Sequence, residues 1–195
     1  AEGSLGAALL TPTRLYVKQA LAAVRAQHGG RAYAGSPLLA AEMLRAQDKI
    51  HLCELHPQEF AALEYVMSPY GAKCHKADGL ERGMAICPPE PRRGMVVIDP
   101  SYEVKTDYEM MAGFVAKLHR KWNVGIIALW YPILTSTAHV PMVRALLDQN
   151  LPDVLHHEVT FPPVRDGHRM TGSGMFIVNA PYGLDAEAKA LSRLF

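Results

Sequence analysis

Acidic side chains follow three short apolar runs of this sequence, where a carboxylate could take part in chemistry. Glu54 closes the run at 49–55, Asp78 with Gly79 follows the next run, and Asp99 ends the run at 94–99. A carboxylate at the end of a parallel strand can accept both hydroxyls of a ribose, which suits Glu54. Asp78 could hold an adenine amino group, and Gly79 would let the backbone approach closely. One such acid alone is more often a loop or cap residue, and three in register weaken that interpretation.

The tetrapeptide "DPSY", residues 99–102, has the groups needed to activate an exocyclic adenine amine. That amine is a poor nucleophile because its lone pair is delocalised into the ring, so attack on a methyl donor requires the nitrogen to pyramidalise. The carboxylate of Asp99 and the carbonyl of Pro100 could each accept a hydrogen bond from one N–H group of the amine. These bonds would stabilise the positive charge that develops on nitrogen. The ring of Tyr102 could stack on a base taken out of its helix. A tight turn with a packed tyrosine is the ordinary alternative.

A second tetrapeptide, "NAPY" from Asn179 to Tyr182, is also similar to an amino-methylating signature. It follows the last predicted strand, which we place in a hairpin at the edge of the sheet. "DPSY" follows an inner strand, next in order after the strands that end in Glu54 and Asp78. Position therefore favours Asp99 as the acceptor that faces the target amine.

Helices and strands alternate along most of the chain and must position these side chains. Two helices come first: one at 11–28, with Thr11 as a possible cap and Pro12 in its first turn, and one capped by Ser36. The β-branched apolar runs predict strands at 49–55, 72–78, 94–99, 124–132, 154–161 and 174–181. Further helices are predicted at 107–121, where Thr106 and Glu109 make a capping box, and near 138–149.

This alternation predicts an α/β fold, doubly wound, with a mostly parallel sheet covered by helices on both faces. The last two strands are joined by a loop without a helix, so we expect them to form an antiparallel hairpin at one edge. We expect residues 1–35 to form a small helical segment, and residues 36–195 to form the catalytic domain.

The bulk composition excludes several classes of protein. The 195 residues carry a formal net charge of +1, so the chain as a whole is not strongly basic and any nucleic acid must be held locally. Such local groups are Arg92 with Arg93, residues 117–122, and Arg165, His168 and Arg169 in the hairpin loop. Three cysteines without a CxxC pair, together with scattered histidines, give no metal-ligand set, and we expect no metal. No apolar stretch approaches the roughly 20 residues of a membrane span, so we expect no membrane partner and a cytoplasmic protein.

Five ordered motifs resemble one known family. They are "GSPLLAAEMLRAQDKIHLCELHP", "KADG", "RRGMVVIDPSYEVKTDY", "ALWYP" and "RMTGSGMFIVNAPYG", which together run from about Gly35 to the C-terminus. This order is similar to that of the ribosomal RNA large subunit methyltransferase J family. The resemblance implies a Rossmann-like class I methyltransferase fold that transfers a methyl group from S-adenosylmethionine to N6 of an adenine in bacterial 23S ribosomal RNA.

Carried over by motif, the resemblance implies site residues in this sequence. The donor would contact Ser36, Glu54, Asp78, Gly79 and Asp99, and catalysis would rest on Asp99, Pro100 and Tyr102. The family tetrapeptide is usually Asp-Pro-Pro-Tyr, so Ser101 is a departure that loosens the backbone of the loop.

The family's first strand, which ends in a Gly-rich turn, has no counterpart before Gly35. That strand lies at the centre of the family sheet, and its loss would leave two inner strands without partners. We therefore expect the chain to be part of a longer protein.

Two other functions stay open from the sequence. The same chemistry could act on DNA adenine, because "DPSY" contacts a flipped base and not its sugar. A non-catalytic nucleic-acid binding protein, linked to the use of external DNA, is a hypothesis of another class. The absent Gly-rich turn favours this binder, and the set of Glu54, Asp78 and Asp99 favours the enzyme. The residues do not predict an oligomeric state.

Overall fold

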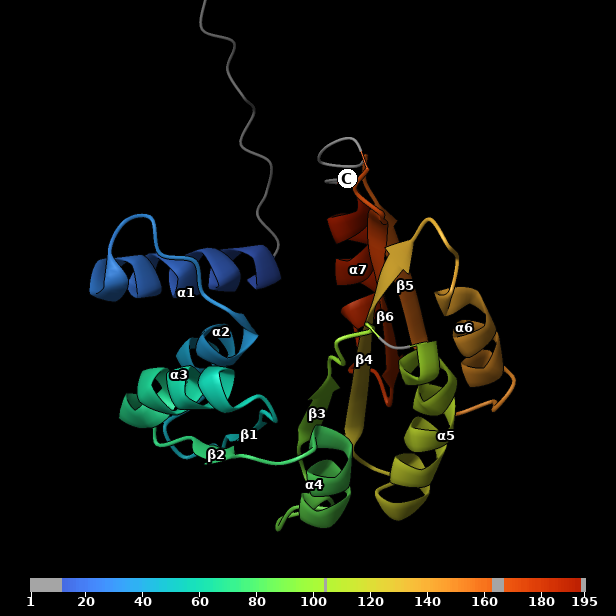
Figure 1. Cartoon of the computed structure of the whole chain (residues 1–195), viewed down its shortest axis with the longest axis horizontal. Coiled ribbons are helices and arrows are strands. Elements are labelled where there is room, and N and C mark those ends of the chain that lie inside the picture. Colours follow the sequence, from blue (N-terminus) through green and yellow to red (C-terminus); the bar gives the residue numbers. More distant parts are fainter. Residues whose placement is uncertain (1–11, 104, 163–166, 194–195) are drawn as a thin grey trace, which may run out of the picture. The chain divides into compact units, whose positions relative to one another are not determined.

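The computed structural model describes residues 12–103, 105–162 and 167–193, and only the backbone at 12–16, 28 and 105. The chain divides into two compact units, residues 1–82 and residues 83–195 (Figure 1). Each unit is described by itself. The helical segment expected at 1–35 lies within the first unit.

The first unit packs helices against a small parallel sheet. Its elements are α1 (Pro12–His28), α2 (Ser36–Met43), β1 (His51–Cys53), α3 (Pro57–Met67), the short 3-10 helix η1 (Ser68–Tyr70) and β2 (Lys73–His75). Helix α4 (Gly79–Ile86) then leads into the second unit. Val24, Ala34, Leu38 and Met67 form the buried core of this part. β1 and β2 run parallel with Cys53 opposite His75, so the segments that follow both strands leave the same edge.

Local sequence explains where these helices begin and end. Pro12 occupies the first position of α1, where the missing N–H is no loss, and Gly29 follows the helix with a φ of 101°. The cap of α2 differs from the prediction. Gly35 is the N-cap and Ser36 is already the first helical residue, so the capping role predicted for Ser36 is wrong.

The second unit is a four-stranded sheet with helices. Its elements after α4 are β3 (Met95–Ile98), α5 (Lys105–Lys121), β4 (Ile126–Leu134), α6 (His139–Leu147), β5 (Leu155–Thr160), β6 (Met170–Val178) and α7 (Leu184–Ser192). The strand order is β3-β4-β6-β5, with β3 parallel to β4 and β6 antiparallel to both of its neighbours. The predicted antiparallel hairpin of the last two strands is confirmed, with β5 at the edge.

Helices cover both faces of this sheet, as adjacent residues of β5 show. His156 faces a pocket that it shares with Val143 and Leu147 of α6. The next residue, His157, contacts Ser192 of α7 through its Nε2 at 2.7 Å. Because successive side chains of a strand point to opposite faces, α6 and α7 lie on opposite sides of the sheet (Figure 1). The fully buried side chains of this unit include Trp122, Tyr131 and Phe176, each at most 1% exposed.

Three features differ in detail from the sequence prediction. Among the described residues the strands form two sheets, β1-β2 and β3-β4-β6-β5, and not one. β4 is buried along almost its whole length as predicted, but β3 leaves Met95 and Val97 more than half exposed. Helix α5 begins at Lys105, so Thr106 lies inside the helix and does not cap it. None of the described helices is long and apolar enough to cross a membrane.

Candidate active site

Glu54 and Asp78 both lie just beyond the carboxyl ends of the small parallel sheet, as the sequence predicted. The N–H of Glu54 donates to the carbonyl of His75 at 3.1 Å, which continues the β1–β2 pairing by one residue. The Oε1 atom of Glu54 accepts the N–H of His56 at 2.8 Å. This bond holds the half-buried carboxylate at the strand end, and the second oxygen can accept a hydroxyl.

Asp78 forms the N-terminal cap of α4. Its Oδ1 atom accepts the N–H groups of Leu80 and Glu81, each at 2.9 Å. A cap is the ordinary role of an aspartate at this position, and it leaves Oδ2 able to accept an amino group. Gly79 is exposed beside it, and a Cβ there would meet Cys53 at an ordinary contact of 3.7 Å. The glycine is therefore not required by packing in this structure.

Ser36 is exposed in the first turn of α2, in the same unit as Glu54 and Asp78. The structure thus places four of the five predicted donor-binding residues, including Gly79, in the first unit. Asp99, Pro100 and Tyr102 belong to the second unit.

Asp99 lies directly after β3, beyond the carboxyl end of that strand. Its side chain is exposed, yet partial burial of the carboxyl raises its pKa above the ordinary value. A carboxylate that has lost part of its water shell is a strong hydrogen-bond acceptor for a donor that reaches it. Pro100, half-buried, follows it and carries the predicted carbonyl acceptor.

Tyr102 clamps the loop that carries Asp99 to the neighbouring strand. Its hydroxyl donates to the backbone carbonyl of Trp130 at 2.7 Å, and its ring packs on Tyr108 with centroids 4.4 Å apart. The ring is 7% exposed, and burial raises the pKa of its hydroxyl. Tyr102 also has a φ of 55°, an unusual backbone conformation for a bulky residue, which the two contacts hold in place. The predicted stacking of a target base on this ring stays a prediction.

Ser101 makes a contact that a proline could not make. Its hydroxyl donates to Oδ2 of Asp107 in the first turn of α5 at 3.4 Å. This long bond links the exposed serine to the helix that follows the loop. The departure from the family tetrapeptide therefore exchanges the stiffness of a proline ring for a weak hydrogen bond.

The rival tetrapeptide lies at the other end of the sheet. Val178, the residue before Asn179, pairs with Ile127 near the start of β4, whereas Asp99 follows the end of the parallel strand β3. The Asn179 amide donates to the carbonyls of Asn123 at 2.9 Å and Gly125 at 2.7 Å. Asn179 therefore stabilises the turn that leads into β4.

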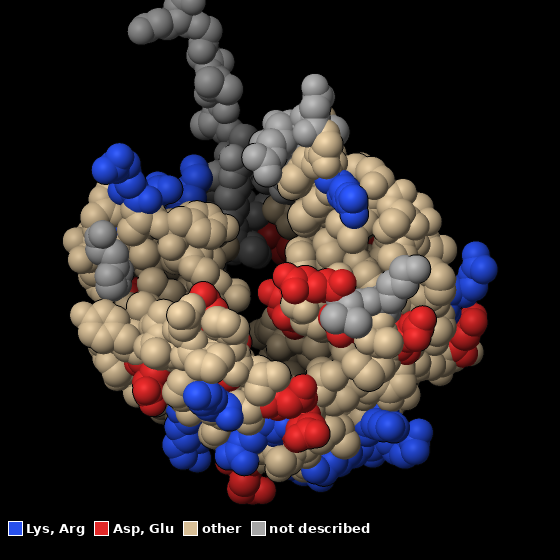
Figure 2. All heavy atoms as spheres, viewed as in Figure 1, with Lys and Arg blue, Asp and Glu red and all other residues tan. Residues whose placement is uncertain are grey.

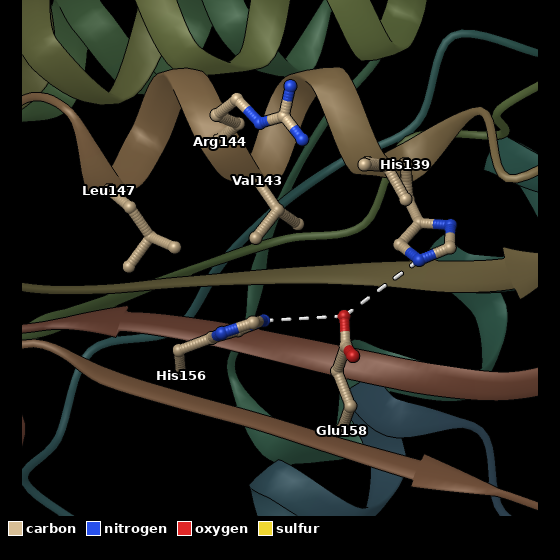
Figure 3. A pocket seen from close by; sticks show the side chains of 7 residues that line it. His139, Val143, Arg144, Leu147, His156 and Glu158 are labelled. Atoms are coloured by element: carbon tan, nitrogen blue, oxygen red, sulfur yellow. Dashed lines mark hydrogen bonds and ion pairs between the residues drawn. The ribbon is translucent and has the colours of Figure 1, made fainter.

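A polar cluster that the sequence did not predict lies between β4, β5 and α6 (Figure 3). The Tyr131 hydroxyl lies 2.7 Å from both His156 Nε2 and Glu158 Oε1, and His139 Nε2 lies 3.9 Å from the same carboxylate oxygen. These groups adjoin a shallow pocket of about 250 Å³. Burial raises the pKa of Tyr131 and lowers that of His139, so these two rings favour their neutral forms.

Gly174 of β6 makes this cluster possible. A Cβ at that position would lie 2.2 Å from the ring of Tyr131, which crosses the strand to reach Glu158. A glycine inside a predicted strand is a sequence signal for such a close approach. Within the described residues, no group of three or more His, Cys, Asp or Glu side chains could hold a metal ion.

Two of the predicted basic segments are joined by tertiary structure. The Trp122 indole donates to the carbonyl of Arg92 at 3.1 Å, which brings the 92–93 pair against the end of α5. In the hairpin loop Arg165 lies outside the described residues, and Arg169 is exposed.

Two parallel strand pairs, acids after β1, β2 and β3, and an antiparallel last strand between β4 and β5 are the features of a Rossmann-like methyltransferase fold. Residues 13–194 match the family described as "Ribosomal RNA large subunit methyltransferase D, RlmJ". The chain belongs to this family, as the sequence motifs predicted.

Individual relatives agree with the family match. The chain is 37% identical over 158 residues to ribosomal RNA large subunit methyltransferase J of Escherichia coli K12, covering 80% of this chain and 56% of the relative. It is 36% identical over 162 residues to the protein of the same name in Haemophilus influenzae, covering 83% of this chain and 58% of that relative. The chain thus spans little more than half the length of these curated relatives.

A solved structure shows the same fold. The crystal structure of protein LPL1258 from Legionella pneumophila superposes with a TM-score of 0.81 at 28% sequence identity. The superposition covers 94% of this chain and 68% of the Legionella chain. The chain therefore shares its fold with a solved structure.

Proposed function

We propose that this chain carries out S-adenosylmethionine-dependent methylation of N6 of an adenine in 23S ribosomal RNA. One observation carries the proposal: residues 99–102 follow the carboxyl end of β3 in a chain whose residues 13–194 match a ribosomal RNA methyltransferase family. The names of the two curated relatives support a large-subunit RNA substrate. The proposal includes a cytoplasmic location, where that RNA is found in bacteria.

In this proposal Asp99 and Pro100 activate the target amine. The carboxylate of Asp99 and the carbonyl of Pro100 accept the two N–H bonds of N6, which favours the pyramidal nitrogen and stabilises its developing positive charge. S-adenosylmethionine, when bound, would supply an electrophilic methyl group and keep the electron pair of the broken carbon–sulfur bond, and the methylated nitrogen would release one proton to solvent. The raised pKa of Asp99 suits an acceptor that meets a developing cation, because partial loss of water strengthens the interaction.

The donor would be held by residues after β1 and β2, with Asp99 as a further contact. Glu54 has a carboxylate oxygen able to accept the ribose hydroxyls, and Asp78 has Oδ2 able to accept the adenine amino group. Exposed Gly79 presents no side chain to the ligand, and exposed Ser36 offers a hydroxyl. The donor set is thus chemically suited to a nucleoside. The assignment of these residues rests on the family motifs and on their places at the strand ends.

The test measures methyl transfer and donor binding separately. The purified protein is given labelled S-adenosylmethionine with unmethylated 23S ribosomal RNA or with adenine-containing DNA, and calorimetry measures donor binding. We expect donor binding and transfer to the RNA, and a loss of transfer of about 10²-fold or more in Asp99→Ala. Full activity of Asp99→Ala would exclude the proposed mechanism. Transfer to DNA alone would change the substrate, and no donor binding would leave a non-catalytic nucleic-acid binder.

A further inference from the structure

Positive charge is concentrated in the first part of this nearly neutral chain. No aspartate or glutamate occurs between Glu2 and Glu42, whereas the same segment carries Arg14, Lys18, Arg25 and Arg31. The whole chain has 20 Lys and Arg against 19 Asp and Glu. A local field of one sign can therefore exist here although the net charge is only +1.

Helix α1 holds two of these cations in solvent. Ala20 and Val24 are buried in the core of the first unit at 5% and 1% exposure. Lys18 and Arg25 are exposed, and a spacing of seven residues puts them two turns apart on the same side of the helix. The apolar side of α1 thus fixes the helix to the unit, and its cations stay free to contact a partner.

The loop between α1 and α2 adds a third cation and an aromatic ring. Arg31 is exposed, and Tyr33 is 85% exposed although it is a large aromatic residue. The loop itself is anchored, because Ala34 is 1% exposed and the N–H of Ala32 donates to the carbonyl of Gly29 at 2.8 Å. An anchored loop that projects a tyrosine into water offers a platform already ordered for stacking.

Lys18, Arg25 and Arg31 differ from two other exposed cations, Arg45 and Lys189. Arg45 pairs with Asp48 at 3.0 Å, and Lys189 pairs with Asp185 at 3.9 Å. The ion pairs found in the described part of the chain do not include Lys18, Arg25 or Arg31. Figure 2 shows Lys and Arg side chains gathered over the part of the surface that α1 occupies in Figure 1.

We propose that Lys18, Arg25, Arg31 and Tyr33 form a binding surface for single-stranded RNA, in which the three cations contact phosphates and Tyr33 stacks on a base. Basic groups that follow a backbone, beside an exposed aromatic ring, are the combination that binds single strands. A membrane surface fits less well, because the apolar side of α1 is already buried in the unit. The choice of RNA as the polyanion rests on the proposed function.

Salt dependence of binding tests the cations. Fluorescence anisotropy measures the affinity of the purified protein for a short fluorescein-labelled single-stranded RNA between about 50 and 200 mM salt. Each lost phosphate contact makes the slope of log affinity against log salt shallower by about 0.7. Lys18→Gln/Arg25→Gln should therefore reduce the slope by about 1.4. The matched control Arg45→Gln/Lys189→Gln removes the same charge and should leave the slope unchanged.

Substitution of the ring tests stacking. Tyr33→Ala should weaken RNA binding by about tenfold with no change in salt slope, because it removes a stacking contact and no charge. Tyr65→Ala, at a second exposed tyrosine of 82% exposure in the same unit, is the control and should bind RNA as the unmodified protein does. Equal slopes in both double variants would overturn the proposal. Competition by polyglutamate as strong as that by RNA would also overturn it, in favour of an acidic protein partner.

The binding experiment does not depend on methyl transfer. The anisotropy measurement is made without S-adenosylmethionine, so it reports RNA binding by itself. If the protein binds RNA through the four residues but transfers no methyl group, the surface stands and the proposed function fails. If the protein methylates 23S ribosomal RNA and Lys18→Gln/Arg25→Gln binds RNA normally, the proposed function stands and the proposed binding surface fails.

Discussion

Two tetrapeptides of similar letters, Asp99–Tyr102 and Asn179–Tyr182, lie at opposite ends of the same four-stranded sheet. Asp99 is exposed with a raised pKa, whereas the Asn179 amide donates to the carbonyls of Asn123 and Gly125. The exposures of the two tyrosines differ in the opposite sense, since Tyr102 is 7% exposed and Tyr182 is fully exposed. In the first tetrapeptide the tyrosine is packed and hydrogen-bonded, and the acid is exposed. In the second the amide is structural and the tyrosine is free.

Asn179→Asp should have the largest effect on stability. The substitution replaces an N–H donor by a carboxylate oxygen that faces two carbonyl oxygens, at positions where the amide now donates at 2.7 and 2.9 Å. We expect the free energy of unfolding to fall by about 2–4 kcal/mol at neutral pH, from lost hydrogen bonds and like-charge contact. Urea denaturation measures the change. An unchanged midpoint would mean that Asn179 does not stabilise this turn.

Tyr102→Phe should have an intermediate effect. It removes the hydroxyl that donates to the Trp130 carbonyl at 2.7 Å and retains the ring packed on Tyr108. The expected loss is about 1 kcal/mol of unfolding free energy, because one half-buried acceptor loses its partner. Tyr182→Phe is the matched control, and its hydroxyl is in water, so its stability should change by less than about 0.5 kcal/mol. Equal losses in the two variants would contradict the clamp.

Asp99→Asn should have the smallest effect on stability, and the size of this effect depends on pH. Burial raises the pKa of Asp99 in the folded protein, so the unfolded chain releases its proton more easily. Ionisation therefore opposes folding as pH rises through and above the ordinary value of 3.8. Asp99→Asn should be slightly more stable at neutral pH, with a small gain because the carboxyl is exposed, and this gain should vanish below about pH 4. Thermal melts across this range measure it, and a loss of stability at neutral pH would contradict the partial burial.

Much of the fold followed from local patterns. The β-branched runs predicted all six strands of the described residues, because buried strands need apolar residues in short stretches bounded by turns. The sequence predicted the first residues of the helices less accurately. The N-cap of α2 is Gly35 and not Ser36, and Thr106 lies inside α5. The cap position depends on backbone geometry, and several neighbouring residues are of types that could occupy it.

The sequence by itself determined where the chemistry-bearing side chains stand along the chain. Glu54, Asp78 and Asp99 follow strands because a parallel strand must end before the next helix begins, and the residue order alone fixes this. The sequence also determined that positive charge is concentrated before Glu42.

Only the tertiary structure decided what each side chain contacts. It turned Tyr102 towards Tyr108 and Trp130, and Asn179 towards carbonyls far away in sequence. It also packs the ring of Tyr131 over Gly174, where the Tyr131 hydroxyl donates to Glu158. These contacts join residues 6 to 56 positions apart. Most depend on the strand order and register of the sheet, which local propensity does not encode, because hydrogen bonds between strands form between segments distant in sequence.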